Sequence, residues 1–188
     1  RIRGAQDVWA KMFTTYRLLK GIPGVIPQFG FTLSHENIGR FEETFLAMRA
    51  VYPRLRFDDV TVNIFQQSSF YYENHGMKPL DAAEVERQIR KILAMDRDGM
   101  SLNNFLRRRY LQLYLKFLKT KKSPVRCQSL ASTCFLDPYG DLYPCAVYNR
   151  KLLNIRETSL SLKELWKLDE AKKIHRACAA NKCPSCWS

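Results

Sequence analysis

The sequence predicts an α/β protein in which the end of a larger parallel sheet or barrel is joined to a small module of hairpin and helix. Two observations predict it: a strand–helix–strand pattern over residues 28–66, and six cysteines confined to the last 62 of 188 residues. The length suits one ordinary domain or two small ones. With 46% hydrophobic and 26% charged residues, the composition is that of a globular protein.

The first half of the chain alternates between helical and strand patterns. Residues 5–19 have apolar side chains at spacings of three and four, which predicts an amphipathic helix. Residues 28–34 and 59–66 read as strands, separated by a helix over 37–51 that Asn37 can cap. We expect that helix to bury Phe41, Phe45, Leu46 and Met48. Strand, helix and strand at this spacing form a βαβ unit with parallel strands and a right-handed crossover.

Two parallel strands need further strands and cover on both faces to form a stable sheet. The first residue, Arg1, is not a methionine. We therefore expect the rest of the sheet to lie upstream of Arg1, so that the chain is the tail end of an α/β sheet or barrel.

The middle of the chain predicts two more helices. Asp81 and Glu84 form a plausible cap for a helix over 81–95, and a second helix runs from Ser101 to about residue 120. Its expected apolar stripe consists of Leu102, Phe105, Leu106, Tyr110, Leu113 and Phe117. Residues 121–124 read as a linker, and we place a domain boundary near residue 124.

Beyond the boundary, the sequence predicts a β-hairpin and a helix. Residues 133–137 and 142–145 are the hairpin strands, joined by a turn that contains Gly140. Ser161 and Glu164 form a capping box, and the helix that follows carries Leu162, Leu165, Trp166 and Ile174.

The six cysteines allow three chemistries: a disulfide scaffold, a structural zinc site or an iron–sulfur cluster. The first residues lack the apolar core of a signal peptide, which disfavours a secreted disulfide scaffold. Cys183-x-x-Cys186 is a chelating pair, and the hairpin adds Cys134 and Cys145. Four thiolates suit either zinc or a cluster, and spacing alone does not separate the two.

The residues around these cysteines resemble a known signature. Cys127, twelve residues, Gly140, four residues and Cys145 resemble the opening of the auxiliary-cluster modules of radical S-adenosylmethionine enzymes, called SPASM and, in shorter form, Twitch domains. Residues 135–145, 153–157 and 165–166 extend this resemblance, which covers residues 125–188. Residues 5–66 resemble, more weakly, the last elements of the family's partial (β/α)6 barrel. The resemblance implies three parts: the barrel end over 1–80, a helical linker over 81–124 and the cluster module over 125–188.

The resemblance also implies site residues. By position, Cys127 and Cys145 match the first ligands of an auxiliary [4Fe–4S] cluster, and Cys183 and Cys186 match the pair that completes it in Twitch modules. Cys134 resembles a third early ligand in SPASM modules, which bind two clusters. We expect one cluster here, or two if the parent chain continues. Cys178 has no clear counterpart and can be a buried helix cysteine. Ser34 and Asn37, which follow the strand over 28–34, are candidates for contact with S-adenosylmethionine.

The function that the resemblance implies is radical enzymology. A second [4Fe–4S] cluster reduces S-adenosylmethionine to a 5′-deoxyadenosyl radical, which abstracts hydrogen from substrate, while the auxiliary cluster transfers electrons or binds substrate. The Cys-x-x-x-Cys-x-x-Cys loop that holds the catalytic cluster is absent from this sequence, so we expect this stretch alone to be inactive. The implied partners are a peptide, protein or small-molecule substrate and an electron donor such as flavodoxin or ferredoxin, in the cytoplasm.

The net charge of +13 leaves a second class of function open. Between Asp98 and Asp137 there is no acidic residue, and aromatic residues are interleaved with basic ones. This pattern fits a zinc-stabilised, basic nucleic-acid-binding module without redox chemistry. The aromatic residues fall on or beside the predicted helix stripe, which favours instead a core face with a solvated basic face. Cations beside an anionic cluster would also stabilise it. No apolar run approaches the ~18 residues of a membrane span.

Overall fold

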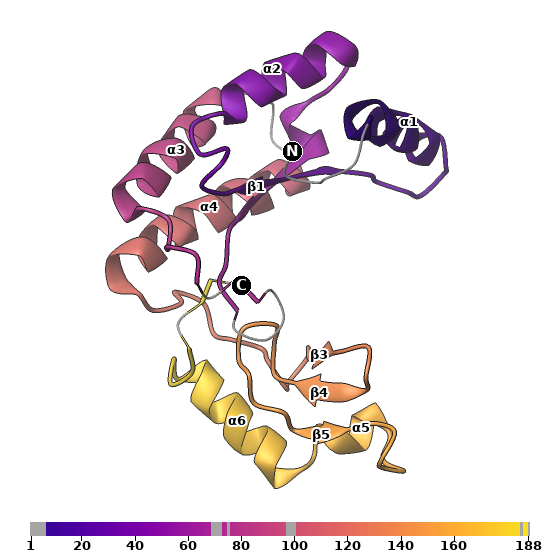
Figure 1. The fold of residues 1–188 in the computed structure, drawn as a ribbon, viewed down its shortest axis with the longest axis vertical. Helices are drawn as coiled ribbons and strands as arrows, with labels where there is room; N and C mark the ends of the chain where they lie inside the picture. The colour runs from indigo at the N-terminus through magenta and orange to yellow at the C-terminus, as the bar shows by residue number, and fades with distance from the viewer. Residues whose placement is uncertain (1–6, 69–72, 75, 97–100, 185, 188) are drawn as a thin grey trace. The chain divides into compact units, whose positions relative to one another are not determined.

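The computed structural model describes residues 7–68, 73–74, 76–96, 101–184 and 186–187 (Figure 1). The chain divides into two units, which we describe separately. Unit 1 consists of residues 1–65 and 80–115, and unit 2 of residues 66–79 and 116–188.

Unit 1 contains the predicted βαβ arrangement. Strands β1 (Phe29–Leu33) and β2 (Val60–Ile64) pair in parallel, with Phe29 opposite Val60 and Leu33 opposite Ile64. Helix α2 (Phe41–Val51) and a 3-10 turn, η1 (Phe57–Asp59), lie between them in the chain. Before them comes α1 (Val8–Lys20); after them come α3 (Ala82–Met95) and α4 (Leu102–Thr120), which continues into unit 2. The parallel pair is confirmed, and the described residues add no third strand to this sheet.

Helices cover one face of this sheet. The rings of Phe13 and Tyr16 on α1 lie 5.2 and 4.3 Å from the ring of Phe29 on β1, and Phe41 on α2 lies 5.2 Å from Phe31. On the opposite face the side chains are small or polar, and Gly30, Thr32 and Asn63 are exposed. The alternation of the strands therefore separates an apolar, helix-covered face from a polar one.

Helix α2 begins later than predicted. It starts at Phe41 rather than 37, and no side chain caps it, so the expected capping role of Asn37 is wrong. The Asn37 side chain instead accepts the Ser34 backbone N–H at 2.8 Å and donates to the Thr32 carbonyl at 2.8 Å. The Asn37 side-chain groups that could have capped α2 are therefore hydrogen-bonded within the turn after β1. Leu46, expected in the core, is 57% exposed.

The buried face of α4 also differs from the prediction. Asn104, Leu111 and Tyr114 are buried, whereas Leu102, Phe105 and Leu106 are largely exposed. The predicted stripe is therefore wrong over the first turns of the helix. The reason is a polar anchor that fixes how the helix is rotated about its axis.

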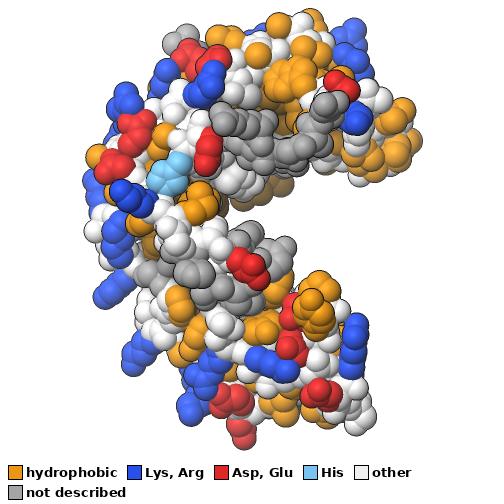
Figure 2. Space-filling model, in the orientation of Figure 1, with side chains coloured by type: hydrophobic (Ala, Val, Ile, Leu, Met, Phe, Trp, Pro, Cys, Tyr) orange, Lys and Arg blue, Asp and Glu red, His pale blue; other side chains and the backbone are white. Residues whose placement is uncertain are grey.

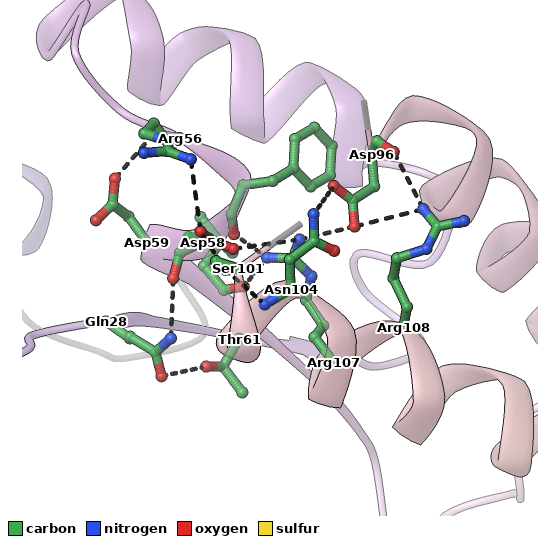
Figure 3. Close-up of polar contacts among 12 residues, drawn as sticks. Gln28, Arg56, Asp58, Asp59, Thr61, Asp96, Ser101, Asn104, Arg107 and Arg108 are labelled. Atoms are coloured by element: carbon green, nitrogen blue, oxygen red, sulfur yellow. Dashed lines mark hydrogen bonds and ion pairs between the residues drawn. The ribbon is translucent and has the colours of Figure 1, made fainter. Parts of the chain in front are cut away.

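This anchor is a buried ion pair between Arg107 of α4 and Asp96, which follows α3 (Figure 3). The Arg107 guanidinium lies 2.7 Å from the Asp96 carboxylate, and their side chains are 8% and 2% exposed. Arg107 also donates to the Val60 carbonyl at 3.3 Å, and the Asn104 amide donates to Asp96 at 3.2 Å. The network therefore joins α3, α4 and β2 through one carboxylate.

Unit 2 contains the predicted hairpin. Strands β3 (Phe135–Leu136), β4 (Asp141–Tyr143) and β5 (Leu153–Asn154) form an antiparallel sheet in that order. The Ser161–Glu164 capping box is present and starts α5 (Leu162–Leu165). The predicted single helix is wrong: Leu168 has extended backbone angles and α6 (Asp169–Ala179) is separate. The core of the unit consists of Leu130, Leu142, Leu165, Ala171, Ile174 and Cys178.

We expect Asp96→Ala to destabilise the protein by about 3–5 kcal/mol, because it leaves the buried Arg107 charge with only the more distant Asp58 carboxylate, at 4.0 Å. Chemical denaturation measures this loss. The exposed Arg40–Glu43 pair, at 2.8 Å, provides the control, since Glu43→Ala removes only a solvated contact and should change stability little. A double Asp96→Leu/Arg107→Met variant should lose less than Asp96→Ala; an equal or larger loss would contradict the role given to the unpaired charge.

Candidate metal centre

Two cysteines lie at either end of the hairpin region of unit 2. Cys127 precedes a tight loop in which the Leu130 N–H donates to the Thr133 carbonyl at 2.7 Å. Cys145 follows β4, and its sulfur accepts the Tyr148 backbone N–H at 3.4 Å. Both side chains are half-buried.

Two more cysteines lie at the end of α6. The inner face of this helix buries Ala171, Ile174 and Cys178, spaced by three and four residues. The helix ends in a Schellman motif: Asn181 has φ 55°, its N–H donates to the Cys178 carbonyl at 3.0 Å, and the Lys182 N–H donates to the Ala177 carbonyl at 2.8 Å. This reversal brings Cys183 back to Cys178, whose thiol donates a hydrogen bond to it.

The Cys127 and Cys145 thiols affect the pKa values of the Cys178 and Cys183 thiols. Burial raises the pKa of the Cys178 thiol to about 12, and the nearby Cys183, Cys127 and Cys145 thiols add to the rise. Burial also raises the pKa of Cys183, with Cys127 and Cys145 adding to it while the hydrogen bond from Cys178 opposes it. Cys127 and Cys183 pack on the same apolar core to which Cys178 belongs. The structure therefore brings together Cys127, Cys145 and Cys183 of the predicted set and adds Cys178.

The other two predicted ligands are Cys134 and Cys186. Cys134 packs against the core, and burial alone raises its pKa. Cys186 is half-buried beside Trp187, which is 4% exposed and whose ring lies 6.1 Å from Phe117. The roles of Cys134 and Cys186 stay predictions.

The candidate metal ligands in this part of unit 2 are cysteine sulfur atoms. All six cysteines have free thiols. His175 on α6 is engaged elsewhere: its Nδ1 lies 2.9 Å from the Ser129 carbonyl. Thiolates suit soft ions, so the residues present fit an iron–sulfur cluster and fit zinc as well. Within the described ranges, no group of three or more His, Cys, Asp or Glu residues lies close enough together to hold a metal ion.

Ser68, which is distant in sequence, is hydrogen-bonded to Ala146, the residue after Cys145. Ser68, which is 3% exposed, donates from Oγ to the Ala146 carbonyl at 2.7 Å. Asn74 accepts the Ser68 N–H at 2.8 Å and donates to the Gln66 carbonyl at 2.9 Å. No sequence signal pointed to this contact, because a serine 78 residues away from its partner leaves no local pattern.

The other predicted binding residues, Ser34 and Asn37, lie at the carboxyl end of β1 in unit 1. Their mutual hydrogen bond and the contact of the Ser34 hydroxyl with Glu36 at 2.7 Å make an ordered turn. Contact of these residues with S-adenosylmethionine stays a prediction.

On the face shown in Figure 2, Lys and Arg side chains are interspersed with Asp and Glu side chains. Part of the basic run is used inside unit 1. Arg107 pairs with Asp96, and Arg108 donates to the Leu93 and Asp96 carbonyls, each at 3.1 Å. Within the described residues, no helix has both the length and the apolar character of a bilayer span.

Residues 127–187 match the family model of SPASM, an iron–sulfur cluster-binding domain. This is the characteristic auxiliary domain of radical S-adenosylmethionine enzymes, as the resemblance predicted. The match covers the hairpin, α5, α6 and all six cysteines. Comparison with curated proteins and with solved structures gave no match.

The turn that precedes Cys145 gives a direct test of this part of the fold. Gly140 has φ 92°, and a Cβ there would lie 3.0 Å from Asn154 Oδ1 and 3.1 Å from Arg156 Cγ. We expect Gly140→Ala to cost about 1–2 kcal/mol from the left-handed backbone alone, and more from the close contacts.

Two glycines provide controls for Gly140→Ala in the same denaturation experiment. Gly24 has φ 79° with open space around it, so Gly24→Ala reports backbone strain alone. Gly76, in unit 2, has neither feature, so Gly76→Ala should be nearly neutral. If Gly140→Ala loses no more stability than Gly24→Ala, the Asn154 and Arg156 side chains move aside without an energetic cost.

Proposed function

We propose that this chain is the C-terminal part of a radical S-adenosylmethionine enzyme whose SPASM domain holds an auxiliary [4Fe–4S] cluster. The observation that carries the proposal is the match of residues 127–187 to SPASM, a segment that contains all six free cysteines. An apolar core beneath the thiols keeps water away from one side of the site. When bound, a cluster with four cysteine ligands supplies electron transfer; an open iron site for substrate would require one ligand fewer.

We assign the cluster to Cys127, Cys145, Cys178 and Cys183. The hydrogen bond between Cys178 and Cys183 and their electrostatic coupling to the other two thiols support this set. The sequence resemblance instead favours Cys186 as the partner of Cys183. Cys134 and Cys186 are then the candidates for a second auxiliary cluster.

Unit 1 is, in this proposal, the end of the partial (β/α)6 barrel. The support is the parallel β1–β2 pair with its helices on one face and with Gly30, Thr32 and Asn63 exposed on the other. Small and polar residues suit a face that lines a barrel interior, and chemistry in such barrels occurs at the carboxyl ends of the strands. Ser34 and Asn37 follow the carboxyl end of β1, where S-adenosylmethionine would bind. Radical formation and hydrogen abstraction would require the catalytic cluster loop from another part of the protein.

The proposed partners follow from charge and redox chemistry. A chain with a net charge of +13 attracts acidic proteins, which suits a flavodoxin or ferredoxin as electron donor and an acidic peptide as substrate. Free thiols and an iron–sulfur cluster suit the reducing cytoplasm.

Metal content tests the proposal against the zinc alternative. We expect the intact protein, purified without oxygen, to be brown and to contain iron and sulfide in about equal amounts, because residues 127–187 match a domain that binds iron–sulfur clusters. Stoichiometric zinc without iron would support the basic zinc module and refute the proposed function.

Single cysteine variants test the ligand set. Cys178→Ser and Cys183→Ser should each lose most of the auxiliary iron, since each removes a soft ligand while almost preserving side-chain volume. Cys134→Ser is the comparison: Cys134 packs on the same core but only burial affects its thiol, so this variant should keep the iron assigned to Cys178 and Cys183. Iron retention in Cys178→Ser together with iron loss in Cys186→Ser would replace Cys178 by Cys186. Circular dichroism of each apo variant verifies folding.

A further inference from the structure

Ser129 has a side-chain hydroxyl that is hydrogen-bonded to the thiol of Cys127, one of the four proposed ligands. Its Oγ lies 3.2 Å from the Cys127 sulfur, and its backbone N–H lies 3.5 Å from the same sulfur. Ser129 is 5% exposed. Among the described residues, its hydroxyl has no other hydrogen-bond partner. A buried hydroxyl thus points at one proposed cluster ligand.

The direction of this hydrogen bond follows from the chemistry of sulfur. A free thiol can donate its proton to the serine oxygen, but a metal-bound thiolate has no proton to donate. A hydroxyl both donates and accepts, so Ser129 can turn its own proton toward the sulfur without moving its heavy atoms.

The backbone of Ser129 is fixed from two sides. Its carbonyl can only accept, so the contact at 2.9 Å means that His175 donates from Nδ1. On the other side, Ser129 forms a β-bridge with Thr133, and Leu130 adopts a left-handed conformation with φ 56°. His175 and Cys178 lie three residues apart on α6. The same helix therefore presents one proposed ligand and holds the residue that contacts another.

We propose that Ser129 is a positioning residue that donates a hydrogen bond to the Cys127 thiolate and raises the reduction potential of the auxiliary cluster. The inference rests on the proposed function. Reduction adds negative charge to a cluster and its thiolates, so a donor aimed at a sulfur stabilises the reduced form more than the oxidised form. The Ser129 and Tyr148 backbone N–H groups contribute in the same direction, but only the Ser129 hydroxyl can be removed by substitution.

The test compares hydroxyl-containing and hydroxyl-free side chains at position 129. Thr and Val have the same branched shape and differ in one hydroxyl, so Ser129→Thr and Ser129→Val share any effect of added volume. Ser129→Ala removes the hydroxyl without added volume. Ser132, which is exposed in the same loop, gives the control Ser132→Ala.

The readout is the midpoint potential of the auxiliary cluster in the intact protein, followed by electron paramagnetic resonance during a reductive titration. The auxiliary signal is the one that disappears in Cys183→Ser. We expect Ser129→Ala to shift the potential to more negative values, and Ser129→Val to lie below Ser129→Thr. Ser132→Ala should match the unmodified protein. Resonance Raman bands of the iron–cysteine bonds should also shift less on transfer to heavy water in Ser129→Ala.

Two outcomes overturn the inference alone: an iron-loaded Ser129→Ala protein with unchanged potential, or equal potentials in Ser129→Thr and Ser129→Val. Protein that binds no iron would overturn the proposed function and the inference together. The iron assay of the unmodified protein therefore separates the two failures.

Discussion

The packing of α6 against the small sheet is the interaction on which the rest of unit 2 depends. Ala171, Ile174 and Cys178 face the same core as Leu142, which is fully buried on β4. This helix face decides where the Cys178 thiol points. The Schellman motif at its end then decides where the chain returns with Cys183, and α6 also carries His175, which holds the Ser129 carbonyl. An apolar contact thus places polar and sulfur groups that are distant in sequence.

Unit 1 uses a different constraint, a buried charge. Asp96 is almost completely enclosed and receives Arg107 and Asn104 from successive turns of α4. Ion pairs at such sites fix geometry more reliably than they add stability. Here the pair rotates α4 so that Asn104 and Leu111 are buried while Phe105 is exposed. The packing of α4 follows from satisfying one carboxylate rather than from burying the most apolar stripe.

Features that depend on neighbouring residues were predictable from the sequence. The βαβ unit, the Gly140 hairpin and the Ser161–Glu164 cap all follow from short patterns of period, turn chemistry and capping. Features that depend on distant partners were not. Asn37 looked like a helix cap because its alternative partners lie in the turn before it. Cys178 is the buried helix cysteine that its position predicted, but the influence of Cys127 and Cys145 on its pKa has no local pattern in the sequence. The SPASM signature identified the module, and the choice of its ligands stays a proposal.

The difference between local sequence patterns and distant contacts also explains why the positive charge of the chain does not identify one partner. The basic run between Asp98 and Asp137 reads as a continuous patch, yet its residues do different things. Arg107 is buried in an ion pair, and Arg108 binds carbonyls at the end of α3. Charges that neutralise a buried carboxylate or bind helix carbonyls are not available to phosphates of a nucleic acid, whose binding depends on the number of free cations. The other basic residues of the run, among them Arg109, Lys116 and Lys122, contribute a positive field that by itself selects no partner.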